Sequence, residues 1–554
     1  ALLERIDAGA SGKFILEITD RHSAEDFFEL DQKGNKVVIR GNNNLSLAAG
    51  VNWYLKHYAG IHLSWNGMQA LLPKRLPPVG KPERRSTSLL RRYYLDFPIY
   101  TYETAFWDWS RWQQEIDWMA LHGVTMPLAA AGTESVWMNV LKRLGYSEAE
   151  IARFIPAPPY LGLWLEGKVT QWEGETAAVW YERTTALQKK IVAAMREYGM
   201  EPVLPAFNGT MPRDAAERLT IATLPAERWN GFPAPVYIAP DDPQFREIAR
   251  LYYQEMKRLY GESDYYASPD IPAEIGEAVF RALKNAQPGA RWIVPLANER
   301  MDFLGTIDRG DVILLDKSPQ SPDKRNAATA NQPFSYHEWI LGITSTRGGN
   351  TGLYGSIDKT AETFGSARKE ARALSLTGIG LAGESIGNNP VIAELIYELP
   401  WMTDTDPDKW LERYVTARYG GYNANMQRAW KLLAEGIYAP SEEAWREGAF
   451  QSPFAARPAL HPERVSKGGT LACHYDADTL TEVVRIFAKE AAVLGSGNNF
   501  QYDFVDVVRQ AAATKGLQLL EKIGSAYEAK NRQDFNLYTA RFLDLLEHQN
   551  ELLG

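Results

Sequence analysis

The sequence predicts an α/β protein: a TIM-type (β/α)8 barrel with a small N-terminal α/β domain and a C-terminal all-α domain. Strand-like and helix-like segments alternate through residues 81–402, with eight candidate strands. A shorter α/β pattern occupies residues 1–80, and helical periodicity continues through residues 403–554. A doubly wound sheet would show the same alternation, but the count of eight favours a closed barrel.

The N-terminal domain is predicted from two strands and one helix. Residues 13–18 and 36–40 are rich in Ile, Leu and Val, which favours strands. Residues 45–57 place their large apolar side chains on one helical face. A Pro- and Arg-rich connector at 76–85 then separates this unit from the barrel.

The barrel is predicted from short apolar segments bounded by polar ones. The candidate strands are 90–96, 124–129, 202–206, 264–268, 292–297, 312–316, 339–344 and 378–381. Helices are expected between several of them, at 109–122, 186–198, 243–260 and 271–285. In the C-terminal domain the strands stop, and helices are expected at 409–419, 425–437, 480–495, 503–529 and 533–552.

Composition narrows the classes of partner. The formal net charge is −9, which argues against nucleic acid or an anionic membrane as the main partner. The sequence has no long uncharged apolar run, so no transmembrane helix is predicted. Seventeen Trp and 27 Tyr suit a carbohydrate partner, because sugar C–H faces pack on aromatic rings; filling a large core is the alternative role. The oligomeric state is left open.

No metal or cofactor is expected. The single cysteine, Cys473, excludes an intrachain disulfide and a multi-Cys metal site. Eight His occur without an HExxH motif. One GxGxxG runs from Gly378 to Gly383, but the next helix begins only after Pro390, so these glycines are interpreted as room for close packing at a strand end.

Glu384 is the leading catalytic candidate. An apolar run, 374–381, precedes it, and a helical pattern begins after Pro390. This places Glu384 at the carboxyl end of the eighth strand, where TIM barrels carry their chemistry. A solvated loop glutamate is the alternative interpretation.

Polar and aromatic side chains follow the other strands as well. The candidate substrate-binding residues among them are Asp96, Tyr100, Trp107, Asn208 and Asn350. Carboxylates and aromatic rings on one rim, without His or Cys ligands, suit glycoside hydrolysis. In that chemistry one carboxylate attacks the anomeric carbon and a second carboxylic acid protonates the leaving oxygen.

Long motifs in this chain resemble those of the α-N-acetylglucosaminidases, glycoside hydrolase family 89. Residues 106–123 read FWDWSRWQQEIDWMALHG, residues 132–137 read GTESVW, and residues 348–355 read GGNTGLYG. The segment around Glu384 is similar too, and the resemblance covers nearly the whole chain in order.

The resemblance implies a retaining exo-glycosidase that acts on terminal α-linked N-acetylglucosamine. It implies that Glu384 is the nucleophile, that Glu134 binds sugar hydroxyls and that Trp172 lines the sugar pocket; a packed loop aromatic is the alternative for Trp172. The protein is expected to be secreted or periplasmic after removal of a signal peptide, and of bacterial origin.

The acid/base is where this chain departs from the family pattern. The family glutamate follows strand four, and here residues 265–274 run almost directly into a helix. Glu274 is the nearest glutamate, but it also fits the first turn of that helix, and Asp270 fits its N-cap. Glu299, at the end of strand five, is the second candidate.

Three added charges suggest a changed pocket. Asp96, Lys317 and Arg347 stand where the family has uncharged or different residues. They favour a charged sugar or one without the acetamide, since cationic side chains grip carboxylates or sulfates; solvated loop charge is the alternative for Lys317 and Arg347. A catalytically impaired carbohydrate-binding protein on the same scaffold is the alternative function.

Overall fold

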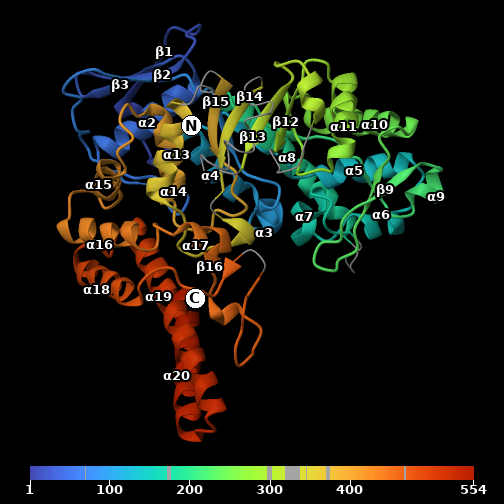
Figure 1. Cartoon of the computed structure of the whole chain (residues 1–554). Helices are drawn as coiled ribbons and strands as arrows, with labels where there is room; N and C mark the ends of the chain where they lie inside the picture. The colour runs from blue at the N-terminus through green and yellow to red at the C-terminus, as the bar shows by residue number, and fades with distance from the viewer. Residues whose placement is uncertain are drawn as a thin grey trace.

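The computed structural model describes residues 1–68, 70–170, 176–295, 302–317, 337–344, 346–369, 375–466 and 469–554. Figure 1 shows the barrel strands at the centre of the main body, with the N-terminal domain beside them and long C-terminal helices extending away. The predicted α/β class with a TIM barrel is confirmed.

The central sheet contains eight parallel strands in the order β6-β5-β15-β14-β13-β12-β11-β7. Hydrogen bonds from Ala129 N to Val203 O (2.8 Å) and from Val203 N to Pro127 O (2.9 Å) join its two ends. All eight predicted strands are confirmed, with shorter bounds for several. They are β5 (Arg91–Tyr94), β6 (Met126–Pro127), β7 (Leu204–Pro205), β11 (Tyr265–Ala267), β12 (Arg291–Pro295), β13 (Val312–Asp316), β14 (Glu338–Ile343) and β15 (Leu376–Leu381).

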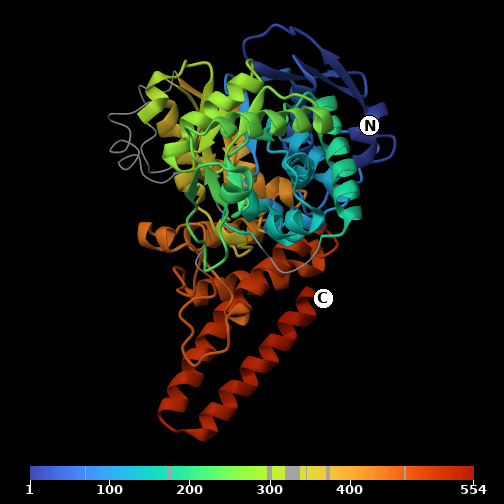
Figure 2. The same cartoon turned by 90° about the vertical axis from the view of Figure 1, so that its right-hand side faces the viewer.

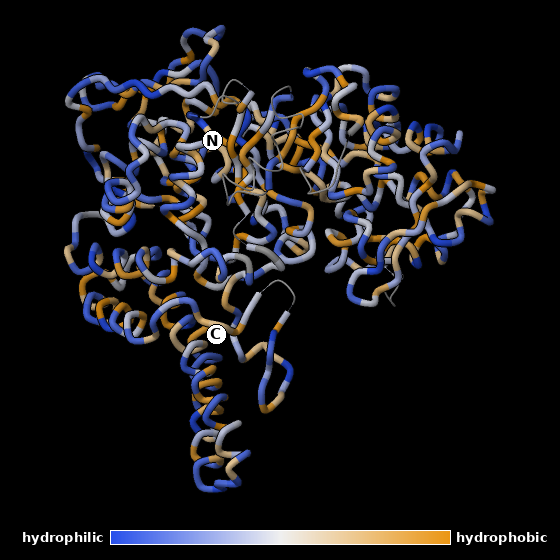
Figure 3. Tube along the Cα trace, in the orientation of Figure 1, coloured by the Kyte–Doolittle hydropathy of each residue, from blue (hydrophilic) through white to orange (hydrophobic). Residues whose placement is uncertain are grey.

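Helices surround this sheet, and every residue of β13 is buried. Figure 3 shows hydrophobic residues concentrated in the barrel strands. The helices from the barrel region are α3 (Ile99–Tyr102), α4 (Trp109–Leu121), α5 (Thr133–Arg143), α6 (Glu148–Phe154), α7 (Leu161–Leu165), α8 (Ala178–Tyr198), α9 (Ala215–Leu219), α10 (Pro243–Tyr260), α11 (Ala273–Ala286), α13 (Ile357–Lys369) and α14 (Val391–Glu398).

An antiparallel sheet inserted after β7 is not predicted by the sequence. It consists of β8 (Thr210–Met211), β10 (Val236–Ile238) and β9 (Thr223–Pro225). Each strand has only two or three residues, which is too short for an alternating pattern to be recognised.

The N-terminal domain packs α2 (Asn44–His57) on a four-stranded sheet of order β1-β3-β2-β4. The strands are β1 (Phe14–Ile18), β2 (Asp26–Lys33), β3 (Lys36–Gly41) and β4 (Glu83–Thr87), and α1 (Leu2–Ile6) precedes them. The two predicted strands and the helix are confirmed. Strands β2 and β4 are not predicted, because their charged residues hide the apolar alternation, and β4 extends this sheet past the predicted boundary at residue 80.

The C-terminal region contains all five predicted helices. They are α15 (Pro407–Arg418), α16 (Ala424–Glu435), α18 (Ala477–Leu494), α19 (Asn498–Glu528) and α20 (Arg532–Leu553), with the short α17 (Glu442–Glu447) between them. The expectation that strands stop here is wrong in one detail: β16 (Ala449–Phe450) pairs with β17 (Gly469–Thr470). Figure 2 shows α19 and α20 as an antiparallel pair projecting from the body. In the described part of the chain, no helix has the length and apolar character needed to cross a membrane.

Candidate active site

Glu384 lies just beyond the carboxyl end of β15, as predicted. Two glycines bring this strand close to β5: a Cβ on Gly378 would lie 1.9 Å from Arg91 O, and one on Gly380 would lie 2.1 Å from Tyr93 O. Any side chain there would separate the strands. The close-packing interpretation of the GxGxxG segment is therefore confirmed for Gly378 and Gly380.

The Glu384 carboxylate is half-buried and accepts a hydrogen bond from Gly348 N–H. Burial raises its pKa, the negative charge of Asp96 adds to this, and Lys168 and Lys317 oppose it. Tyr102 packs beside this loop, since a Cβ on Gly349 would lie 2.5 Å from the Tyr102 ring. The Glu384 carboxylate is thus oriented by a backbone hydrogen bond and has two lysines among its charged neighbours.

Two ion pairs lie beside Glu384. Lys317 Nζ is 2.7 Å from Asp96 Oδ2, and Lys168 Nζ is 2.9 Å from Glu166 Oε2. The charges of Glu166 and Asp270 also act on Lys317, and those of Glu384 and Asp270 act on Lys168. We call these six side chains the rim cluster: Asp96, Glu166, Lys168, Asp270, Lys317 and Glu384.

Replacing Lys317 with Met is expected to destabilise the protein by about 2–3 kcal/mol, because it leaves the buried Asp96 without its counter-ion. The free energy of unfolding from urea titration at neutral pH measures this. The double variant Asp96→Asn/Lys317→Met should recover part of the loss, since it removes both charges. A single-variant loss within experimental error would show that this pair is solvated.

Two predicted substrate-binding residues form hydrogen bonds to backbone atoms with their polar groups. Tyr100 OH donates to Leu128 O (2.7 Å) and accepts from Ala130 N (2.9 Å). Asn208 Nδ2 donates to Leu165 O (2.9 Å), and its Oδ1 accepts from Thr210 N and Oγ1. Both side chains support the rim, and direct sugar contact by either stays a prediction.

Glu134 and Trp107 line a cavity of about 360 Å³ with several aromatic rings. Glu134 is buried and accepts a hydrogen bond from Trp180 Nε1 at 3.2 Å, and burial raises its pKa. Arg111 stacks on the Trp107 ring, 3.9 Å from its centroid. The aromatic residues lining this cavity are Tyr100, Phe106, Trp107, Trp109, Trp112, Trp164 and Trp180.

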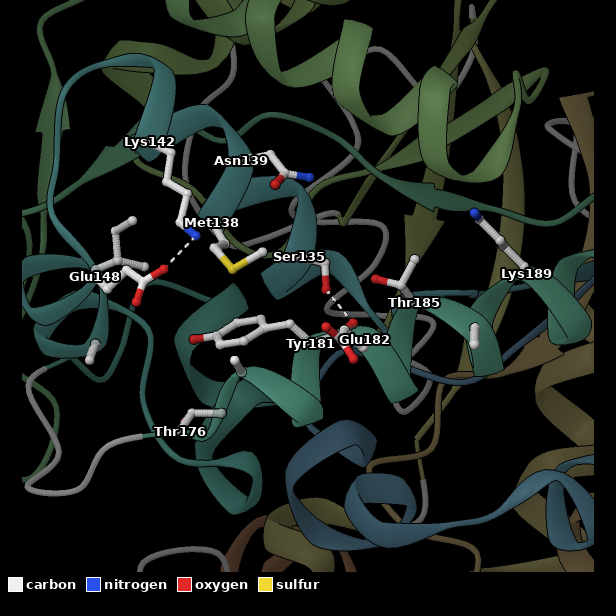
Figure 4. A pocket seen from close by; sticks show the side chains of 14 residues that line it. Ser135, Met138, Asn139, Lys142, Glu148, Thr176, Tyr181, Glu182, Thr185 and Lys189 are labelled. Atoms are coloured by element: carbon white, nitrogen blue, oxygen red, sulfur yellow. Dashed lines mark hydrogen bonds and ion pairs between the residues drawn. The ribbon is translucent and has the colours of Figure 1, made fainter.

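A second cavity, of about 510 Å³, lies between α5, α6 and α8 (Figure 4). Its lining comes from α5, α6, α8 and Thr176, and it includes an ion pair between Lys142 and Glu148 at 2.8 Å. Ser135 lines it and donates to Tyr181 O, while the preceding Glu134 faces the aromatic cavity. None of its lining residues belongs to the rim cluster.

Two further candidates, Glu274 and Asn350, lie in the described part of the chain. Glu274 is exposed in the first turn of α11, the position that favours a helix-dipole role. Asn350 Oδ1 accepts from Gly352 N (2.8 Å), and its buried Nδ2 finds no hydrogen-bond partner in the described part of the chain. Glu299, Trp172 and the side chain of Arg347 lie outside the described residues.

Sequence reasoning missed Glu166 and Lys168. They lie in a turn after α7, far from any strand end. The expectation that site residues follow barrel strands therefore does not include them. The only available signal is a Glu-Gly-Lys placed between Trp164 and Trp172. Among the residues described, no group of three or more His, Cys, Asp or Glu side chains could hold a metal ion.

Helix α19 of the C-terminal domain anchors the loop that carries Glu384. Asn389 Nδ2 donates to Asp503 Oδ1 (2.8 Å), and Tyr502 OH donates to Asn388 O (3.1 Å). The same helix holds the loop after β14, because Arg509 donates to Thr351 Oγ1 at 2.9 Å. The geometry around Glu384 therefore depends on the C-terminal domain.

Replacing Asn389 with Ala is expected to cost about 1–3 kcal/mol of stability and to lower kcat by up to about 10²-fold, because the loop loses its tether. Urea unfolding and steady-state kinetics measure the two effects. Asn531→Ala is the control, since Asn531 caps α20 away from the barrel and should lower stability alone. Unchanged kcat in Asn389→Ala would contradict the anchoring role.

Comparison with known proteins gives matches along nearly the whole chain. The three domain models of α-N-acetylglucosaminidase (NAGLU) match it: the N-terminal domain at residues 1–78, the TIM-barrel domain at 92–403 and the C-terminal domain at 410–554. Human α-N-acetylglucosaminidase is 31% identical over 528 residues, which covers 89% of this chain and 69% of the human protein.

Solved structures of a family 89 glycoside hydrolase from Clostridium perfringens also match. One is a variant with two Glu→Gln substitutions in complex with its substrate GlcNAc-α-1,4-galactose (TM-score 0.92), and another is in complex with 2-acetamido-1,2-dideoxynojirmycin (TM-score 0.90). Each is 28% identical and covers 100% of this chain. The chain spans 64% of the length of these structures.

Proposed function

The chain belongs to the α-N-acetylglucosaminidase family of glycoside hydrolases, and we propose that it is a retaining, exo-acting α-glycosidase. Its proposed substrates are glycans that end in α-linked N-acetylglucosamine or a related hexosamine. The observation that carries this proposal is the position of Glu384, half-buried beyond β15 and oriented by Gly348. The complex of the Clostridium perfringens relative with GlcNAc-α-1,4-galactose supports the choice of sugar.

In the proposed mechanism, Glu384 attacks the anomeric carbon and forms a covalent glycosyl-enzyme. Lys168 and Lys317 favour its ionised form against the effect of burial. Water then displaces Glu384 from the same carbon, so two inversions give net retention. The acid/base that serves both steps should lie about 5–5.5 Å from Glu384.

A related charged sugar is the second candidate substrate. Lys168 and Lys317 each carry an ammonium group with three hydrogen-bond donors at the rim. Each forms one ion pair, Lys168 with Glu166 and Lys317 with Asp96. The remaining donors would suit a carboxylate or sulfate on the sugar.

A panel of 4-nitrophenyl α-glycosides tests both candidates, with N-acetylglucosamine, unsubstituted glucosamine and sulfated or uronic sugars. The anomer that forms first, followed by NMR, tests the stereochemistry: the α-anomer is expected, and the β-anomer would exclude retention. Binding without turnover for every sugar would favour the catalytically impaired carbohydrate-binding protein instead.

We also propose that the protein acts outside the cytoplasm, as a secreted or periplasmic enzyme. The proposed substrates support this, because complex glycans are displayed mostly on exported molecules. Fractionation of cells that produce the full-length protein, with an antibody against it, tests the proposal; recovery in the cytoplasmic fraction alone would reject it.

A further inference from the structure

The turn that carries Glu166 is held by hydrogen bonds to the end of α7. It follows α7, and Gly167 N donates to Trp164 O (2.8 Å) while Lys168 N donates to Leu163 O (2.9 Å). Gly167 has φ +72°, and a Cβ there would lie 2.9 Å from Tyr237 OH. Only glycine fits this left-handed, close-packed position without strain, so the two flanking side chains are fixed in direction.

The barrel holds the same turn from outside. Asn208, which follows β7, donates to Leu165 O at 2.9 Å, and Thr170 N donates to Pro233 O at 3.0 Å. Glu166 therefore stands on a rigid element although it comes from a loop. This is the kind of support that a catalytic side chain requires.

Glu166 and Glu384 face the same set of charges. The Glu166 side chain is 8% exposed and lies 2.9 Å from Lys168 Nζ. Lys168, Lys317 and Asp96 all act on Glu166, and the same three groups act on Glu384. Tyr102 is influenced by both carboxylates, and Tyr237 by Glu166. The two glutamates therefore lie among the same charged side chains.

Burial raises the pKa of Glu166 to about 7, with Asp96 adding to the increase and Lys168 and Lys317 opposing it. A carboxyl group with such a pKa is partly protonated at neutral pH and can donate a proton. The side chains of Asp270 and Glu274, in contrast to that of Glu166, are exposed to solvent.

We propose that Glu166 is the general acid/base of this enzyme and that it works opposite Glu384. The inference rests on the proposed function. In the first step the Glu166 carboxyl proton moves to the glycosidic oxygen, the C1–O bond breaks, and the Glu384 carboxylate bonds to C1. In the second step water attacks C1, its proton moves to the Glu166 carboxylate, and Glu384 leaves as a carboxylate. The alcohol and the sugar are released and both groups return to their starting states.

Glu166→Gln should slow hydrolysis according to the leaving group. With the sugar that the panel identifies, the methyl α-glycoside should lose about 10²–10⁴-fold in kcat/KM, because a poor leaving group needs the proton. The 2,4-dinitrophenyl α-glycoside should lose less than about 10-fold, because its leaving group needs little assistance. Glu148→Gln is the matched control: this glutamate also pairs with a lysine, but it is exposed (Figure 4).

The outcomes separate this inference from the proposed function. Wild-type protein that hydrolyses no α-glycoside would reject the proposed function. Active wild type with equal losses for both substrates in Glu166→Gln, or a leaving-group-dependent loss in Asp270→Asn instead, would reject only the role of Glu166.

A second variant covers the case in which Glu166→Gln does not fold. Because Lys168 lowers the pKa of Glu166, Lys168→Met should move the alkaline limb of the kcat/KM–pH profile to higher pH. An alkaline limb that stays in place would overturn the proposal.

Discussion

Replacing Glu384 with Gln is expected to lower turnover of an activated aryl α-glycoside by about 10⁴-fold or more, because the amide cannot form the glycosyl-enzyme. The fold should not change, since the amide oxygen can still accept the hydrogen bond from Gly348 N–H. Steady-state kinetics and urea unfolding of the same preparation measure the two properties.

Azide should partly restore turnover in Glu384→Ala, because a small anion can enter the space left by the carboxylate. Glu277→Gln is the control for a carboxylate on the barrel surface, since Glu277 is exposed on α11 and pairs with Arg281. Turnover that Glu384→Gln leaves unchanged would remove Glu384 as nucleophile, whatever the outcome for Glu166.

The barrel is predictable from the sequence because its strands are buried runs between polar turns. β13 shows this most clearly, as its predicted and observed bounds agree at residues 312–316. The strands β8, β9 and β10 are not predictable, because pairing across an insertion, rather than a local pattern, defines segments of two or three residues.

The site residues are predictable only where they come directly after a barrel strand. Glu384, Asp96 and Lys317 come directly after strands, and the structure brings their charges together. Glu166 and Lys168 reach the same rim through tertiary packing, since Asn208 and Tyr237 place their turn. Tyr100 shows the converse: it lies where a ligand residue is expected, yet its hydroxyl holds the backbone after β6.

A buried ionic cluster connects all three domains. Glu394, on α14, bonds to Lys56 from the N-terminal domain, and His122 Nε2 lies 2.9 Å from Glu394 Oε1. Lys56 also bonds to Glu398, which accepts from Trp410 Nε1 of the C-terminal domain (2.8 Å). Burial alone would raise the pKa of Glu394, but His122, Lys56 and His62 hold it well below its usual value.

Replacing Lys56 with Met is expected to cost about 3–5 kcal/mol at pH 7.5, because two buried carboxylates lose their shared cation. In the wild type, the depressed pKa values of Glu394 and Glu398 give stability that is present above the unfolded pKa of about 4.3 and is lost only as pH falls below it.

Without Lys56 these pKa values should rise, and a proton taken up by the cluster would replace the missing cation. His62 is a second site for such a proton: its Nε2 lies 3.1 Å from Glu394 Oε2, and burial lowers its pKa to about 4 with Lys56 contributing. The deficit of Lys56→Met relative to wild type should therefore shrink between pH 7.5 and pH 5, as urea unfolding at both values would show. Lys142→Met is the control, because its exposed pair with Glu148 should contribute nothing measurable. A deficit that is constant over this range would mean that lost packing, and not unpaired charge, explains the role of Lys56.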